Sequence, residues 1–137
     1  MDRTNCKTYF LITGDFHPDE ISAILKIDRT GGHSIGENKR YGSGVFDWAG
    51  WEYGTDYVDT LYADEQADSV VNQLLHKVDE LLLIRETYRC RFILMQVPKV
   101  EEGLTPAMGF SKKVIDFCSR TKTEIQIDLY VNPFDYK

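Results

Sequence analysis

The sequence predicts an α+β domain with a mainly antiparallel sheet, and three patterns carry this prediction. Residues 7–13 and 88–97 are rich in aromatic and branched aliphatic side chains, as in buried strands. Residues 64–87 repeat apolar side chains at intervals of three and four, as in an amphipathic helix. Residues 124–130 alternate apolar and polar side chains, as in a strand with one covered face. Helices and strands are therefore mixed along the chain.

The length and composition fit a single domain that covers residues 1–137. A chain of this size buries about 65–70% of the surface that its unfolded form exposes. The hydrophobic fraction of 42% is typical of a globular protein rather than a disordered one. We therefore expect one hydrophobic core that needs neither a disulfide nor a structural metal.

The first strand and the first helix are predicted within residues 7–25. The strand over residues 7–13 stops at Gly14 and Asp15. Pro18 then begins a helix, because a proline at the first helical position loses no hydrogen bond. Asp19 and Glu20 suit the positive end of the helix dipole. The apolar side chains that would face the core are Ile21, Ile24 and Leu25.

The next part of the chain is predicted as two strands separated by the longest loop. A short apolar piece around Ile27 is taken as the second strand, and residues 28–44 form a glycine-rich, charged loop. Loops of this length are uncommon in compact domains and are either functional or mobile. Residues 45–53 are predicted as the third strand, and Trp48 and Trp51, three residues apart, cannot share one of its faces.

The second half is predicted as a helix over residues 64–87, a strand over residues 88–97 that ends at Pro98, a helix over residues 111–120 and a strand over residues 124–130. The order of the first six elements matches a split βαβ (ferredoxin-like) arrangement, to which a C-terminal helix and strand are added. The order of the strands in space and the oligomeric state do not follow from these patterns.

The charge balance bears on the class of partner. The formal net charge is −6, the wrong sign for a protein that binds nucleic acid mainly through phosphate contacts. A basic protein partner suits this charge better, although acidity also serves solubility alone. Nucleic acid and membrane are therefore not expected as partners.

The cysteines and the apolar runs bear on the compartment. The three cysteines are odd in number, far apart in sequence and flanked by apolar residues, so we expect reduced, packed thiols. No run approaches the length of about 18 apolar residues that a membrane span requires, and no secretory signal is present at the N-terminus. The sequence therefore predicts a cytoplasmic protein.

Motifs for cofactors, metals and catalysis are weak. The glycines at 42 and 44 lead into an apparent strand rather than a helix, which disfavours a phosphate-binding loop, and no cofactor is predicted. The three histidines lack metal-ligand spacing, so no metal site is predicted. The best catalytic alternative joins Asp15, His17 and His33, which would have to converge within hydrogen-bond distance. Asp15 and Asp19 are equally explained as turn and helix-start residues.

An aromatic and acidic run at residues 47–64 is the feature that most favours partner binding. Aromatic side chains beside carboxylates would suit a basic surface, with the rings as anchors and the acids as a charged rim. The alternative is a core strand followed by solvated acids. The residues predicted to bind a partner are Trp48, Trp51, Tyr53, Asp56, Tyr57 and Asp59.

The chain resembles a bacterial family described as domain of unknown function 4279. The resemblance rests on residues 9–14, on the helix entry at residues 17–22, on the region of Trp48 and on residues 127–131. It implies a small bacterial domain and brings no catalytic or binding residues with it. Many small acidic domains without a catalytic site resemble immunity proteins that neutralise a toxin, which is an analogy of type rather than of site.

The leading hypothesis from the sequence is a non-enzymatic, protein-binding module, with an immunity-type toxin inhibitor as one form of it. The first alternative is a small-molecule binding module in which the loop over residues 28–44 closes over a pocket at one edge of the sheet. The second alternative is an enzyme that uses Asp15, His17 and His33.

Overall fold

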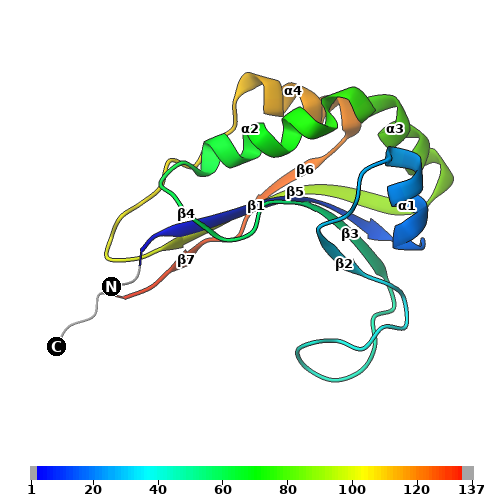
Figure 1. The fold of residues 1–137 in the computed structure, drawn as a ribbon, viewed down its shortest axis with the longest axis horizontal. Helices are drawn as coiled ribbons and strands as arrows, with labels where there is room; N and C mark the ends of the chain where they lie inside the picture. Colours follow the sequence, from blue (N-terminus) through cyan, green and yellow to red (C-terminus); the bar gives the residue numbers. More distant parts are fainter. Residues whose placement is uncertain (1–2, 134–137) are drawn as a thin grey trace.

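The computed structural model describes residues 3–133 and has two layers, a sheet and a set of helices packed on one of its faces (Figure 1). The sheet has seven strands and is mostly antiparallel. The predicted α+β class with a mainly antiparallel sheet is therefore confirmed. Within the described residues, no helix is both long and apolar enough to cross a membrane.

The sheet has the order β2-β3-β1-β5-β6, with two short strands beside its long central pair. All neighbours run antiparallel except β6 and β7, which run parallel to β5. The short strand β4 pairs with the start of β1, and β7 pairs with the end of β5. The strands are β1 (Asn5–Gly14), β2 (Gly31–His33), β3 (Ala49–Gly54), β4 (Val58–Asp59), β5 (Cys90–Val100), β6 (Glu124–Ile127) and β7 (Tyr130–Val131).

Two helices, α1 and α4, begin after a residue whose polar side chain caps the first turn. α1 (Pro18–Leu25) begins after His17, whose Nδ1 accepts a hydrogen bond from the Asp19 N–H. α4 (Lys112–Thr121) begins after Ser111, whose Oγ accepts from the Val114 N–H. Each cap satisfies one of the N–H groups that the first turn leaves without a partner.

The helix predicted over residues 64–87 is interrupted in the structure. It consists of α2 (Ala63–Leu74), a 3-10 turn (Leu75–Lys77) and α3 (Val78–Thr87). The apolar spacing continues across the break, which contains neither glycine nor proline, so the sequence carries no signal for it. The interruption lets both helices keep their buried residues on the sheet, where Val71, Leu74, Val78 and Leu81 all belong to the core.

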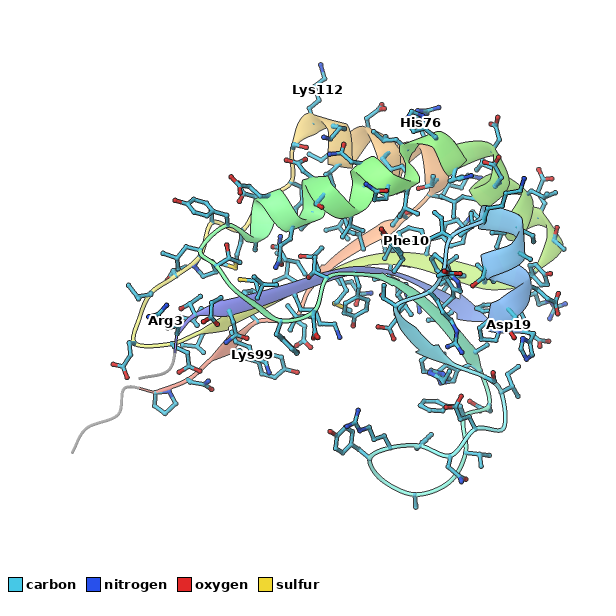
Figure 2. All side chains as sticks on the ribbon, in the orientation of Figure 1. Arg3, Phe10, Asp19, His76, Lys99 and Lys112 are labelled. Atoms are coloured by element: carbon cyan, nitrogen blue, oxygen red, sulfur yellow. The ribbon has the colours of Figure 1, made fainter. Side chains whose placement is uncertain are left out.

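The core lies between the two layers. Phe10 and Ile12 of β1 and Phe92 and Leu94 of β5 are fully buried and face the helices. The Phe10 ring lies 5.4 Å from that of Phe92 and 6.0 Å from that of Phe117 in α4, between the sheet and the helices (Figure 2). Aromatic pairs at these separations contribute about 0.5–1.5 kcal/mol beyond the area that they bury.

A small polar cluster sits inside this core and fixes the start of α2 on the sheet. Thr8 Oγ1 donates to Gln66 Oε1 over 3.1 Å, and Gln66 Nε2 donates to the Cys6 carbonyl over 2.9 Å. Gln96 Nε2 of β5 donates to the Ala63 carbonyl over 3.1 Å. Because buried polar groups are costly without partners, these bonds favour one position of the helix over others.

Two predicted strands lie elsewhere in the structure. The second strand is at Gly31–His33 and not around Ile27, whose side chain instead packs against the core. The third strand begins at Ala49 and not at residue 45, because residues 36–39 and 44–46 pair with each other, as the bridge between Asn38 and Val45 shows. The predicted loop is therefore largely a hairpin that extends the β2–β3 pair.

Pro98 does not end the fifth strand as predicted; β5 continues to Val100. The carbonyls of Gln96 and Val100 accept from Asp128 and Asn132, so alternate residues of β5 turn their backbone polar groups toward β6 and β7. Pro98 lies midway between them and faces the interruption between these two strands. A proline is tolerated there because no ladder hydrogen bond needs its missing N–H.

The second face of the sheet is covered by no helix in the part of the chain that the structure describes (Figure 1). Along β1, the side chains of Lys7, Tyr9, Leu11 and Thr13 are half-exposed, and they alternate with buried residues of the helix-covered face. Lys99 of β5 also lies on this side of the sheet (Figure 2). We call this surface the open face.

Candidate functional site

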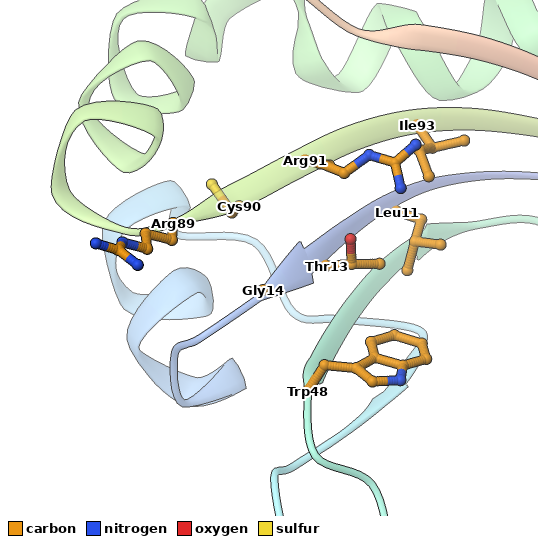
Figure 3. Close-up of a pocket in the computed structure, with 8 residues that line it drawn as sticks. All are labelled: Leu11, Thr13, Gly14, Trp48, Arg89, Cys90, Arg91 and Ile93. Atoms are coloured by element: carbon orange, nitrogen blue, oxygen red, sulfur yellow. The ribbon is translucent and has the colours of Figure 1, made fainter.

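A groove of about 650 Å³ lies on the open face. Figure 3 shows the Trp48 ring facing Leu11 and Thr13 of β1, with Arg91 and Ile93 on the neighbouring strand β5. Arg89 lies at the edge and points away from Trp48 in this view. The groove is lined by Leu11, Thr13, Gly14, Trp48, Arg89, Cys90, Arg91 and Ile93.

Trp48 is held in place by an aromatic cluster at the base of the hairpin. The His33 ring stacks on Phe46 with centroids 3.4 Å apart, and it meets Trp48 edge-on at 4.3 Å. A Cβ at Gly50 would lie only 3.1 Å from the His33 ring, so glycine leaves room for the ring on the sheet. Trp48 is 39% exposed. The groove therefore has a large aromatic wall whose position is set by its neighbours.

His33 supports this wall as a neutral ring. Burial lowers the pKa of His33, so the imidazole is uncharged at neutral pH. Its Nε2 atom is buried and forms no hydrogen bond within residues 3–133. The contacts of His33 are those of a packed aromatic side chain.

The floor of the groove combines aliphatic and cationic groups. Leu11 and Ile93 lie opposite each other on adjacent strands, and Thr13 lies opposite Arg91. The Arg91 guanidinium donates to Glu124 of β6 over 2.7 Å, and it lowers the pKa of that carboxyl group. The ion pair holds the Arg91 side chain on the open face, beside the apolar floor.

A second, more polar hollow of about 320 Å³ lies farther along the open face. Burial raises the pKa of Tyr9 to about 12, and the negative charge of Glu52 adds to the effect. Beside it, the ammonium groups of Lys7 and Lys99 lie 5.5 and 3.9 Å from the centre of the Tyr57 ring. The hollow is lined by Lys7, Tyr9, Thr30, Gly31, Glu52, Gly54, Thr55 and Asp56.

Comparison with known protein families assigns the chain to one family. Residues 4–132 match the family described as Domain of unknown function (DUF4279). The chain belongs to this family. No curated protein and no solved structure matches it. Membership of the DUF4279 family confirms the resemblance predicted from the sequence, and it covers nearly all of the β-sheet and helices described above.

The six residues predicted to bind a partner lie on different surfaces of this DUF4279 domain. Trp48 lines the groove, and Asp56 lines the second hollow beside Tyr57. Asp59 lies apart from both, in a separate hollow of about 330 Å³ with Leu61 and Leu104. The aromatic and acidic run therefore does not form one continuous surface.

Two members of that run face the helices instead. Trp51 is 0% exposed, and its Nε1 donates to Ser22 Oγ of α1 over 3.0 Å. The prediction that Trp51 contacts a partner is corrected by this burial, because its ring and its only donor are both used inside the fold. Tyr53 stacks beside Trp51 with centroids 6.4 Å apart and packs against the core, so most of its ring is unavailable.

The three residues of the predicted catalytic alternative have separate local roles. The Asp15 N–H donates to the Arg89 carbonyl at the end of β1. His17 caps α1, and its Nδ1 lies 3.7 Å from Asp19 Oδ2. His33 belongs to the aromatic cluster with Phe46 and Trp48. No hydrogen bond or ion pair among residues 3–133 joins these three side chains to one another.

The cysteines are free thiols, as predicted, and lie in or beside the core. Burial raises the pKa of Cys6 and Cys90, and raises that of Cys118 to about 11. Their thiolate forms, which are the nucleophilic ones, are therefore disfavoured. In the part of the chain that the structure describes, no three His, Cys, Asp or Glu side chains gather as a metal site would require.

Sequence reasoning missed most of the groove. The sequence predicts buried strands over residues 7–13 and 88–97, so Leu11, Arg91 and Ile93 are not expected to line an open groove. A signal was available: Lys7, Tyr9 and Thr13 alternate with Cys6, Thr8, Phe10 and Ile12, which is typical of a strand with one wet face. The consecutive apolar run at residues 9–12 obscured this alternation.

Proposed function

We propose that this protein is a non-enzymatic binding module that docks a protein partner on the open face of its sheet. One observation carries the proposal: the helices occupy one face only, and the other face holds a groove of about 650 Å³ walled by the half-exposed Trp48. A large apolar hollow on an otherwise ordinary surface is typical of an interaction site.

The composition of the groove supports a protein partner. Tryptophan and arginine are enriched among residues that dominate binding energy at interfaces, and Trp48 and Arg91 stand at the two sides of the hollow. Leu11 and Ile93 between them supply apolar area that excludes water. Because the Trp48 ring is held by His33 and Phe46, it loses little side-chain entropy on binding.

The charge distribution supports a partner with basic groups outside the groove. Residues 47–68 contain acidic side chains and no lysine or arginine, and Asp56 and Asp59 of this stretch are exposed. Complementary charges at the rim of an interface mainly increase the association rate and the specificity. The net charge of −6 agrees with the expectation that neither nucleic acid nor an anionic membrane is the partner.

Two finer expectations belong to the same proposal. An immunity-type inhibitor that neutralises a toxin remains one form of it, supported by the small size and acidic balance of the chain. The free thiols support a reducing compartment, as in the cytoplasm. For the fold, the order β2-β3-β1-β5, with each neighbour antiparallel, supports the split βαβ arrangement with α4 and β6 added.

The experiment is affinity capture from the native host with three forms of the tagged chain: the wild type, Trp48→Ala and Ile115→Ala. Ile115 is exposed on α4, in the layer away from the open face, and serves as the matched control. We expect a partner that the wild type and Ile115→Ala retain and that Trp48→Ala loses. Equal retention by all three forms would exclude the groove as the docking surface.

A second candidate function, a small-molecule binding module, is favoured by the polar hollow of about 320 Å³. Its size lies at the low end of the range for ligand pockets. Thr30 and Gly31, which belong to the predicted loop at residues 28–44, form part of its wall beside Glu52. A thermal-shift screen with the wild type and Glu52→Gln tests it. Stabilisation of the wild type alone by a cationic compound would support this function.

A further inference from the structure

We propose that the polar hollow of about 320 Å³ on the open face binds a small zwitterion, with the carboxylate of the ligand at Lys7 and its ammonium group at Glu52. This inference names the ligand class for the small-molecule function of the same hollow, and it rests on that function. It does not depend on the groove beside Trp48. Three features support it: two opposite charges that are unpaired among residues 3–133, their separation across the sheet, and a phenol between them.

Lys7 provides a positive charge that no described carboxylate neutralises. Its ammonium group lies 5.0 Å from the centre of the Tyr9 ring and 5.5 Å from that of the Tyr57 ring. The ammonium group of Lys99 lies against the same Tyr57 ring, at 3.9 Å. Neither lysine forms an ion pair within residues 3–133. Two like charges around one ring repel each other, and a ligand carboxylate at Lys7 would reduce this repulsion.

Glu52 of β3 provides the negative charge. It lies on the open face, opposite Leu11 of β1. A Cβ at Gly31 of β2 would lie 3.3 Å from the Glu52 Oε1 atom, so glycine leaves room for the carboxylate beside β2. This carboxylate forms no ion pair in the part of the chain that the structure describes. Asp56 also lines the hollow, but it already accepts from the Tyr57 N–H. Glu52 therefore holds the carboxylate that a ligand can pair with.

The two charges lie on different sides of the hollow. In the strand order β2-β3-β1-β5, the Glu52 carboxylate lies beside β2, and the Lys7 ammonium group lies beside Tyr9 of β1. The two side chains form no ion pair with each other. A ligand with one charge would satisfy one side only, whereas a zwitterion satisfies both. The volume of the hollow is at the low end of the range for ligand pockets, so the ligand is small.

Tyr9 supplies a neutral donor between the two charges. It follows Lys7 by two residues on the same face of β1, and it precedes Leu11, which lies opposite Glu52, by two. Burial, and next the negative charge of Glu52, raise the pKa of Tyr9 to about 12, so the phenol keeps its proton at neutral pH. Its hydroxyl group can therefore donate to the carboxylate of a ligand. A hydrogen bond to a charged acceptor is stronger than one between neutral groups.

The test is an NMR titration of the full chain that follows the ring signals of Tyr9. The zwitterionic probes are glycine, β-alanine and γ-aminobutyrate, in which the distance between the charges increases. Butylamine and butyrate carry one charge each. The proteins are the wild type, Lys7→Met, Glu52→Gln and Lys112→Met. Lys112 is exposed on α4, in the layer away from the open face, and is the matched control (Figure 2).

We expect at least one zwitterion to shift the Tyr9 signals of the wild type and of Lys112→Met in a saturable way, and to bind more tightly than butylamine or butyrate. Lys7→Met and Glu52→Gln should each weaken this binding about tenfold or more, because each removes one charge-assisted contact. Both side chains are half-exposed, so the fold should be unchanged, with circular dichroism as the check.

Three outcomes would overturn the proposal. If butylamine binds through Glu52 alone, or butyrate through Lys7 alone, as tightly as every zwitterion, the small-molecule function stands and the zwitterion does not. If no probe shifts the Tyr9 signals at any accessible concentration, the small-molecule function of the hollow falls as well. If a zwitterion binds all four proteins equally, the ligand occupies another site.

Discussion

The two faces of the sheet differ in what they do for the molecule. On the helix-covered face, Phe10, Ile12, Phe92 and Leu94 are fully buried and meet the side chains of the helices. On the open face, Tyr9, Leu11 and Thr13 of β1 are half-exposed and Ile93 of β5 is nearly buried, and these residues line hollows instead of a core. On these two strands the even-numbered residues therefore form the core, and the odd-numbered ones line the hollows of the open face.

In this protein the burial of a side chain alone does not distinguish the core from the open face. Ile93 is nearly buried on the open face, yet its neighbours there include Arg91, Glu124 and Thr13. On the helix-covered face the buried polar groups are mostly bonded to one another. Substitutions that are paired across the two faces can test this division.

The largest contrast is expected between the two tryptophans. Trp51→Ala should lower the free energy of unfolding by about 3–5 kcal/mol, because it opens a cavity in the core and leaves Ser22 without its indole donor. Trp48→Ala should lower it by less than about 1 kcal/mol, because the ring is exposed at the groove. Urea denaturation of both variants measures the difference. Equal losses would mean that both faces act as packing layers.

A smaller loss is expected when the polar cluster under α2 is broken. Gln66→Ala removes the bonds to Thr8 and to the Cys6 carbonyl and leaves buried groups without partners, which costs about 2 kcal/mol. Gln73→Ala, on the exposed side of the same helix, should change stability by less than about 0.5 kcal/mol and is the control. Thermal unfolding of the two variants compares them. Indistinguishable melting curves would contradict the role assigned to the cluster.

A still smaller effect on folding is expected on the floor of the groove. Leu11→Ala removes a half-buried side chain. It should lower the free energy of unfolding by about 1 kcal/mol, in proportion to the apolar area that folding buries at this position. The same variant should weaken partner capture, since Leu11 lies beside Trp48 in the groove. If partner capture falls while the unfolding midpoint hardly changes, Leu11 contributes more to binding than to stability. Loss of stability as large as that of Trp51→Ala would place Leu11 in the core.

The last effect is confined to alkaline pH and concerns Tyr9. Its pKa in the folded state is about 12, above the ordinary value of 10, so the folded form holds the phenol proton more tightly. Below pH 10 both the folded and the unfolded form keep the phenol proton, so Tyr9 makes its full contribution to the free energy of unfolding. Between about pH 10 and 12 the unfolded form releases it first, so stability falls as pH rises.

An NMR titration of the tyrosine ring carbons measures this directly. We expect one ring that titrates near pH 12 in the wild type and is missing from Tyr9→Phe. The stability of Tyr9→Phe should also depend less on pH in the same window. A midpoint near 10 for Tyr9 would show that the open face is wetter at this position than its burial indicates.

Much of the architecture could be predicted because local patterns and tertiary contacts agree. The alternation at residues 124–130 and the aromatic and branched aliphatic side chains at residues 7–13 predict strands, which the structure has at Glu124–Ile127 and Asn5–Gly14. Pro18 and Ser111 mark the helix starts. The opposite orientations of Trp48 and Trp51 also follow from their spacing and are confirmed. In these segments the sequence period equals the period of the structure, so no long-range information is needed.

The remaining features depend on contacts that no local pattern encodes. Trp51 is the buried tryptophan because its ring packs in the core, where Ser22 of α1, far away in the sequence, accepts its indole hydrogen bond. The place of Pro98 in β5 depends on the gap between β6 and β7, which form later in the chain. The groove needs Leu11 of β1, Arg91 of β5 and Trp48 just before β3, and the order of these segments in space is a tertiary property.

The protected thiols make the protein convenient for site-specific labelling. Since burial raises the pKa of Cys6, Cys90 and Cys118, a maleimide dye at neutral pH should react slowly with all three. Tyr41, at the tip of the hairpin, is among the most exposed side chains. A cysteine introduced by Tyr41→Cys would then carry a fluorophore at the exposed tip of the hairpin, with the native cysteines left in place.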